Sequence, residues 1–216
     1  MRSAAQSVPT RFPIFPLEGA LLLPGGNLPL NIFEPRYLAM VRDAMRTHRV
    51  IGMIQPTEPE EPGRRRAIYR TGCLGGITSF TETEDGRYLI TLTGLCRFDV
   101  VEELTVATPY RQVVADFERW RGDLAPVEPP ADARPRLLAA TEAYFRRRGI
   151  ETDWEAVRAA PLAALVTSLA MLCPFTPTEK QALLEAPDLA HQGELLIALM
   201  DMDVRAAQAS APPVRH

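Results

Sequence analysis

The chain has 216 residues, of which 46% are hydrophobic and 24% are charged, and its formal net charge is -3. This balance is typical of a folded globular protein and excludes a fibrous or fully disordered chain. So small a net charge gives no field strong enough to recruit nucleic acid or an anionic membrane by itself. All of the basic residues except Lys180 are arginines.

The segment from Phe12 to Trp120 has the pattern of short β-strands, because apolar or alternating runs are separated by Pro and Gly. Asp85-Gly86 lies between two alternating runs and predicts a hairpin. Strands of this number and spacing favour a closed or partly closed barrel over a parallel sheet. The expected strands are RFPIF, ALLLP, LPLNIF, VIGMI, GCLGGITSF, RYLITLTG, CRFDVVEEL and YRQVVADFERW.

One helix, at 35–48, is predicted among these strands. Pro35 suits a first helical position, and apolar residues then recur at steps of three and four. His48 is expected to close this helix, where a partly charged imidazole is favourable. The residues expected to face the barrel are Tyr37, Leu38, Val41, Ala44 and Met45.

Two further segments of this half are predicted to be loops. The glycines of 25–27 indicate a turn, and 55–67 is too polar and too rich in proline to pack. The second loop carries both acidic residues and the basic run 64–66. The whole segment 11–120 is therefore expected to form the barrel, after a disordered tail at 1–10.

The second half has a helical period. A linker is predicted at 121–133, a helical subdomain at 134–208 and a disordered tail at 209–216. Gly149 is expected to end a helix that finishes in three arginines. Capping boxes are predicted at Thr152 with Glu155 and at Thr176 with Glu179. Residues 161–173 are apolar nearly all round, which predicts a buried central helix, and 188–207 should form a longer last helix.

The sequence lacks the patterns of common catalytic sites. Lys180 follows Glu179 rather than Gly, so no phosphate-binding P-loop is present, and a Ser-Lys dyad would need this same lysine in a pocket although its helix start should be exposed. His48, His191 and His216 have no metal-ligand spacing. We therefore expect a non-enzyme without metal or cofactor.

The cysteines and the hydropathy indicate the compartment. Cys73, Cys96 and Cys173 form no C-x-x-C pair, so we expect buried thiols rather than a zinc site or a disulfide framework. No apolar run approaches the ~18 residues of a spanning helix, and the N-terminus has no continuous apolar signal region. The expected location is the cytoplasm.

Three blocks carry a family resemblance: FPIFPLEGALLLPGGNLPLNIFEPRYLAMVRDAM, GCLGGITSFTETEDGRYLITLTGLCRFDVVEE and TPTEKQALLEAPDLAHQGELL. Together they cover most of residues 11–200 and resemble the N-terminal substrate-binding domain of the Lon family of ATP-dependent proteases. The resemblance implies an α+β fold, in which a PUA-like β-barrel is followed by an α-helical bundle. Asn31 stands where members of the family often have His.

The same resemblance implies a function. We expect a stand-alone, non-catalytic module that binds unfolded or tagged polypeptide, with a protease as a further partner, and that lacks the family's ATPase and peptidase modules. The alternative is a PUA-like barrel that binds RNA or a small ligand; nucleic acid is not the expected partner. A third interpretation is that the protein is a hydrolase whose catalytic pattern is not recognised.

The candidate partner-binding residues are Glu34, Arg36 and Tyr37, at the start of the helix predicted at 35–48. Glu34 and Arg36 either bind a client polypeptide or form an ion pair with a neighbouring charged residue. Tyr37 is an amphipathic anchor in the functional interpretation, but we expect it to pack the helix onto the barrel. Arg97 is expected to brace the barrel rather than to bind.

Overall fold

The computed structural model describes residues 8–58, 66–124 and 133–210. The chain divides into two compact units, residues 1–125 and 126–216, which are described separately. The predicted tails fall mostly outside the described residues, at 1–7 and 211–216, and so do most of the predicted 55–67 loop and the linker residues 125–132. Among the described helices, none is both long and apolar enough to cross a membrane.

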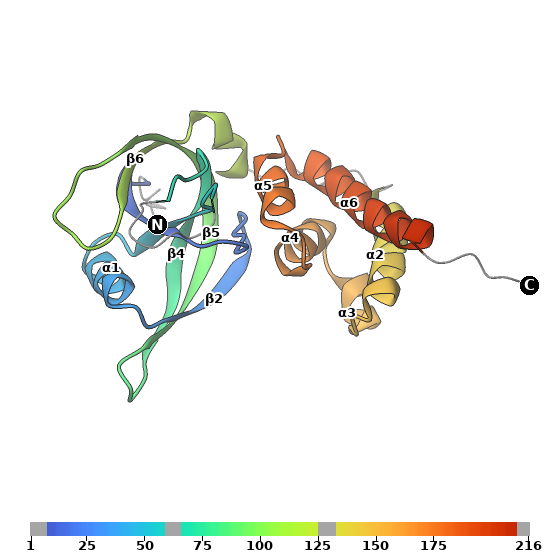
Figure 1. The fold of residues 1–216 in the computed structure, drawn as a ribbon, viewed down its shortest axis with the longest axis horizontal. Coiled ribbons are helices and arrows are strands. Elements are labelled where there is room, and N and C mark those ends of the chain that lie inside the picture. The colour runs from blue at the N-terminus through green and yellow to red at the C-terminus, as the bar shows by residue number, and fades with distance from the viewer. Residues whose placement is uncertain (1–7, 59–65, 125–132, 211–216) are drawn as a thin grey trace, which may run out of the picture. The chain divides into compact units, whose positions relative to one another are not determined.

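The first unit is a six-stranded sheet with one α-helix, in the order β2-β5-β4-β3-β1-β6 (Figure 1). All neighbouring pairs are antiparallel except β1 and β3, which are parallel. The strands are β1 (Arg11–Pro16), β2 (Asn27–Ile32), β3 (Val50–Ile54), β4 (Thr71–Glu82), β5 (Tyr88–Glu103) and β6 (Gln112–Asp116).

β5 is the longest strand, and it pairs with three others. It follows β4 along most of its length, pairs with β2 through Tyr88–Thr93, and pairs with β6 through Asp99–Glu103. The additional β5–β6 pairing completes a circuit of hydrogen-bonded strands, β1-β3-β4-β5-β6-β1. β2 lies outside this circuit, and among the described strands it pairs with β5 alone.

The β4–β5 hairpin follows the prediction. Gly86, in the turn between β4 and β5, has a φ of +79°, a left-handed conformation that glycine adopts without a steric cost. The two strands predicted separately as RYLITLTG and CRFDVVEEL are one strand of 16 residues. The chain does not turn between them, because Gly94, the last residue of the first predicted strand, remains paired with Gly75 of β4.

The predicted strand ALLLP is not a strand. Leu21, Leu22 and Leu23 lie in an irregular segment and are all at most 2% exposed. This segment crosses β5 at Gly94, where an added Cβ would lie 2.0 Å from the carbonyl oxygen of Leu23. Three successive buried leucines cannot alternate between core and solvent, so the segment covers the sheet instead of joining it.

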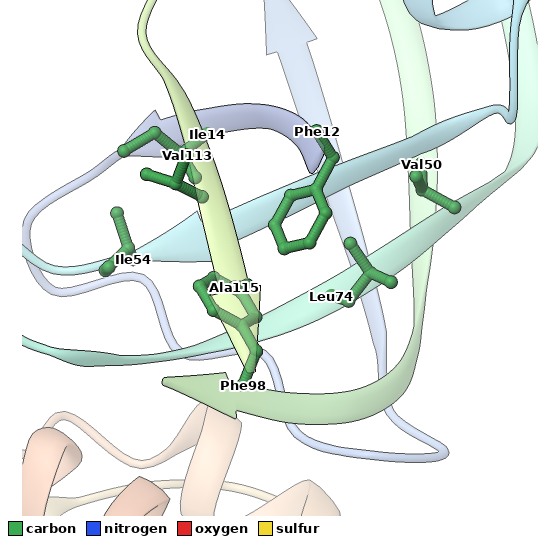
Figure 2. Packing of buried hydrophobic residues seen from close by; sticks show 8 residues of the cluster. All are labelled: Phe12, Ile14, Val50, Ile54, Leu74, Phe98, Val113 and Ala115. Carbon is green, nitrogen blue, oxygen red and sulfur yellow. The ribbon is translucent and has the colours of Figure 1, made fainter. Parts of the chain in front are cut away.

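Alternate residues of five strands form the core of the unit. The rings of Phe12 and Phe98 meet edge to face, with 5.0 Å between their centroids. Figure 2 shows this cluster, and its members come from segments far apart in the chain. The cluster comprises Phe12, Ile14, Val50, Ile54, Leu74, Phe98, Val113 and Ala115.

Helix α1 (Pro35–Arg46) begins at Pro35 as predicted but ends two residues early. Thr47 closes it, because its backbone N–H donates to Ala44 O, and Arg49 then takes a φ of +55°. The prediction that His48 closes the helix is therefore wrong; His48 lies exposed in the turn. The buried residues are Tyr37, Met40, Val41 and Ala44, while the expected Leu38 and Met45 are only partly buried.

A short 3-10 segment, η1 (Glu118–Leu124), replaces the predicted end of the last strand and the start of the linker. Arg97 holds it to β5: its Nη2 donates to Asp123 Oδ1 at 2.6 Å, and its Nε donates to Oδ2 at 2.9 Å. The guanidinium lies 4.0 Å from the ring of Trp120, whose Nε1 donates to Asp99. The prediction that Arg97 braces the first unit is confirmed.

The second unit is a bundle of helices in which α6 packs against α2, α4 and α5. Gly149 ends α2 with a φ of +64°, and Thr176 and Glu179 form the predicted capping box. The other predicted capping box is wrong, because the N-cap is Asp153, whose side chain accepts from two backbone N–H groups. The helices are α2 (Ala133–Arg148), α3 (Trp154–Ala159), α4 (Leu162–Leu172), α5 (Pro177–Glu185) and α6 (Leu189–Ser210).

Helix α4 is not buried all round, in contrast to the prediction. Ala164, Ser168 and Leu172 are exposed, and Leu172 is 81% exposed. These residues recur every four positions and form one stripe of the helix. Two of the three residues are small and occur on buried and exposed faces alike, so the sequence did not distinguish this stripe from the buried face of the helix.

Gly94→Ala tests the close approach of the leucine segment to β5. We expect a loss of roughly 2–3 kcal/mol in the free energy of unfolding, because the new methyl group meets backbone that cannot move aside. The measurement is urea unfolding followed by circular dichroism. Gly76→Ala is the matched control: its Cβ would lie 3.6 Å from the Leu95 side chain, so it should cost far less. Equal losses would contradict this account.

Asp123→Ala tests the buried ion pair. The side chains of Arg97 and Asp123 are 6% and 8% exposed, so removing the carboxylate takes away the counter-charge of a buried guanidinium. We expect a destabilisation of about 3–5 kcal/mol, measured by urea unfolding. Arg121→Ala, which removes an exposed pair with Glu118, is the control and should change stability by less than about 1 kcal/mol.

Candidate binding groove

The first unit contains a cavity of about 510 Å³, a volume in the range that binds small ligands or short peptide segments. One wall is the end of β1 and the turn after it, at 15–18, and the other runs from β2 into the first turn of α1, at 30–37. Arg66 and Arg111 also line it. We refer to this cavity as the groove.

All three residues singled out from the sequence line the groove. Glu34 is the N-cap residue of α1 but its side chain makes no capping bond. It accepts instead from Arg36, whose Nη2 lies 2.7 Å from Oε2, and both side chains are nearly half exposed. The sequence therefore located two charged residues that pair with each other at the rim and remain open to solvent.

Tyr37 belongs to the wall of the groove rather than to its rim. It is 8% exposed, and its ring packs against Phe15 with 4.2 Å between the centroids. The guanidinium of Arg36 lies 4.5 Å from the same ring. The expectation that Tyr37 packs the helix onto the strands is confirmed, and the ring also gives the groove an aromatic wall.

Phe33 is a groove residue that sequence reasoning missed. It is 61% exposed, although it lies between the buried Ile32 and the start of α1. An exposed aromatic ring beside a cavity is a common feature of binding sites. The only signal in the sequence was its place next to Glu34, and the alternation of β2 alone did not show that the strand ends at Ile32.

Two arginines with little solvent exposure complete the groove. Arg111 forms a fork with Glu103, through Nε to Oε1 at 2.5 Å and Nη2 to Oε2 at 2.7 Å. Its Nη1 donates to the backbone oxygen of Arg66 at 2.9 Å. Arg66 in turn donates from Nη2 to Glu18 Oε2 at 2.7 Å. The basic run read from the sequence thus contributes one residue to the groove.

The free edge of β2 is poorly suited to strand addition. Gly94 N donates to Gly26 O, and backbone hydrogen bonding alternates along a strand. The backbone N–H and C=O groups of Leu28 and Leu30 therefore point toward β5, and the backbone groups of Pro29 and Asn31 point toward the open edge. Pro29 has no N–H to donate, so the edge is interrupted at its centre. The groove beside the edge is therefore the better binding surface.

The cysteines lie in the core as expected. Burial raises the pKa of Cys73 well above the usual range, that of Cys96 to about 11 and that of Cys173 to about 12. A thiol held protonated in this way is a poor nucleophile. None of the three lines the groove.

The remaining candidates for chemistry lie outside the groove. Lys180 is partly buried rather than exposed, and its Nζ donates to Met171 O at 3.3 Å; burial lowers its pKa. His48 and His191 are exposed, and His191 contacts Asp188; His216 lies outside the described residues. Within 8–58, 66–124 and 133–210 no cluster of His, Cys, Asp or Glu could hold a metal.

The fold and the groove define a binding module of mixed α and β structure. Residues 11–202 match the family described as the ATP-dependent protease La (LON) substrate-binding domain, and the chain belongs to this family. It is 29% identical over 206 residues to Lon protease 2 of Myxococcus xanthus and 28% identical over 206 residues to Lon protease of Anaeromyxobacter dehalogenans. Each alignment covers 91% of this chain and 24% of the relative, so the chain spans about a quarter of their length.

Solved structures of Lon N-terminal domains have the same fold. The Lon N-terminal domain protein from Xanthomonas campestris superposes with a TM-score of 0.63 at 24% identity, covering 88% of this chain and 98% of that one. The N-terminal domain of the Mycobacterium avium complex Lon protease gives a TM-score of 0.61 at 16% identity, with the same coverage.

Thiol labelling tests the burial of the cysteines. At pH 8 an aromatic disulfide reagent should label the folded protein at least about 100-fold more slowly than the urea-unfolded chain, since a rise of two units in pKa lowers the thiolate fraction about that much. The absorbance of the released aromatic thiol gives the rate. A thiol that reacts in the native protein as fast as in the unfolded chain would contradict the assignment.

Proposed function

We propose that the groove binds apolar segments of unfolded or tagged polypeptide. The observation that carries this proposal is the exposed ring of Phe33 beside a groove walled by the packed rings of Phe15 and Tyr37. The apolar surface of this wall can contact a hydrophobic side chain of the client, which would be buried in the client's core if the client were folded. Membership of a substrate-binding domain family supports the same function.

The roles of Glu34 and Arg36 follow from their position at the rim. Each side chain is nearly half exposed and forms an ion pair with the other. A client polypeptide therefore does not need a charged residue of its own to enter the groove. We propose that this pair borders the bound segment and meets its backbone groups, while Tyr37 and Phe33 contact its side chains. Asn31, which also lines the groove, faces the same segment.

We further propose that the first unit is a PUA-like barrel. The circuit of pairings from β1 through β3, β4, β5 and β6 back to β1 supports this architecture. A closed circuit makes the sheet resistant to shear, because no strand within it can slide without breaking two ladders, and β2 is paired to one of its strands, β5. The unit acts as a rigid platform for binding.

The module acts without catalysis, as a cytoplasmic adaptor that presents a captured polypeptide to a protease. The pairing of Glu34 with Arg36 at the rim of the groove and the protonated, buried thiols support a role in recognition rather than in bond cleavage.

Phe33→Ala tests the proposal. We expect it to weaken binding of a permanently unfolded, carboxymethylated polypeptide by roughly ten-fold or more, because a central exposed aromatic residue contributes strongly to an apolar interface. Fluorescence anisotropy of the labelled polypeptide measures the affinity. The melting temperature should stay unchanged, because the ring is mostly outside the core.

Val101→Ala is the matched control, since Val101 is also exposed, at 63%, in the same unit and does not line the groove. It should leave the affinity unchanged. Equal binding by wild type and Phe33→Ala would refute the groove as the site. Binding of labelled RNA with a steep salt dependence, together with no binding of polypeptide, would favour the alternative function.

A further inference from the structure

Arg66 has an incomplete set of partners. Its side chain is 17% exposed, and its Nη2 forms an ion pair with Glu18 Oε2 at 2.7 Å. Its Nε is buried and, in the part of the chain that the structure describes, has no hydrogen-bond partner. A buried donor without an acceptor is unusual and calls for an explanation.

The carboxylate that faces Arg66 is only loosely held. Glu18 is 50% exposed and lies in the turn after β1. It reaches one outer nitrogen of the guanidinium, whereas a carboxylate bound side-on accepts from Nε and Nη2 together. Arg111 forms that side-on pair with Glu103 and also holds the backbone oxygen of Arg66. Arg111 thus holds the backbone of Arg66, while the Nε of the Arg66 guanidinium lacks an acceptor among the described residues.

We propose that the groove takes the C-terminal end of a polypeptide, and that its terminal carboxylate displaces Glu18 and binds side-on to Arg66. The exchange places one carboxylate where another was against Arg66, so the guanidinium keeps a counter-charge, and it supplies the acceptor that Nε lacks. Glu18 is then a built-in competitor that lowers the affinity for such ends. This inference deepens the proposed function and depends on the same groove.

A chain end fits the groove better than an internal acidic residue. In a C-terminal residue the carboxylate and the side chain leave the same Cα, so a single residue can meet Arg66 and the apolar wall at Leu30, Ile32 and Phe33 together. An internal Asp or Glu has no apolar side chain of its own to place there. It would also bring following backbone groups into the groove without partners.

The test uses labelled peptides that end in Ala-Val-Leu-Phe, with either a free or an amidated C-terminus, and anisotropy as the readout. Wild type should bind the free acid roughly ten-fold more tightly than the amide. Glu18→Gln should tighten binding of the free acid several-fold and leave the amide unchanged. Arg66→Gln should remove the difference between the two peptides.

Two further variants keep the test decisive. Arg66→Lys retains the charge but lacks the fork, so it should also lose most of the preference even if Arg66→Gln fails to fold. Arg87→Gln removes an exposed arginine at the β4–β5 hairpin, where it pairs with Asp85, and should behave like wild type. A third peptide, amidated and with an internal Asp, tests the source of the carboxylate.

The outcomes separate this inference from the proposed function. Equal binding of acid and amide, with Phe33→Ala still weakening both, overturns the carboxylate site and leaves the groove intact. Binding of the internal Asp peptide as tight as that of the free acid overturns the chain-end assignment. No binding of peptide or of unfolded polypeptide overturns both.

Discussion

The first unit depends on β5 pairing with different partners along its length. Its first part lies between β2 and β4, and its second part lies between β4 and β6. The change occurs at Gly94, where the leucine segment passes too close for any side chain. Because β2 is held only by β5, this strand also sets the position of one wall of the groove. The groove therefore results from the strand pairing rather than from a local loop.

Two arginine–carboxylate pairs of the first unit differ in how deeply they are buried. Arg97 and Asp123 are nearly fully buried and share several hydrogen bonds, so neither group can be released without leaving an unpaired charge. Arg66 and Glu18 share a single contact, and Glu18 is half exposed. Replacing Glu18 costs little, because water already solvates much of its carboxylate. The degree of burial therefore distinguishes the structural pair, Arg97–Asp123, from the pair whose carboxylate can be exchanged, Arg66–Glu18.

Much of the architecture could be predicted from the sequence, because the signals are local. The hairpin at Gly86 and the C-cap at Gly149 need a left-handed backbone, and the capping box at Thr176 satisfies its own backbone donors. Interpretations that needed partners distant in the chain were less accurate. The sequence placed Trp120 at a strand end, whereas Arg97 and Asp99 hold it in the 3-10 segment.

By itself the sequence determined the mixed α and β composition, the change from strand period to helical period, and the helix start at Pro35, because these depend on spacing along the chain. Only the tertiary structure decided that Phe33 stays exposed, that Arg66 enters the same cavity and that Glu18 faces it. The reason is physical: a groove is made of surfaces contributed by separate strands and turns, and exposure and pairing are properties of that assembly rather than of any one segment.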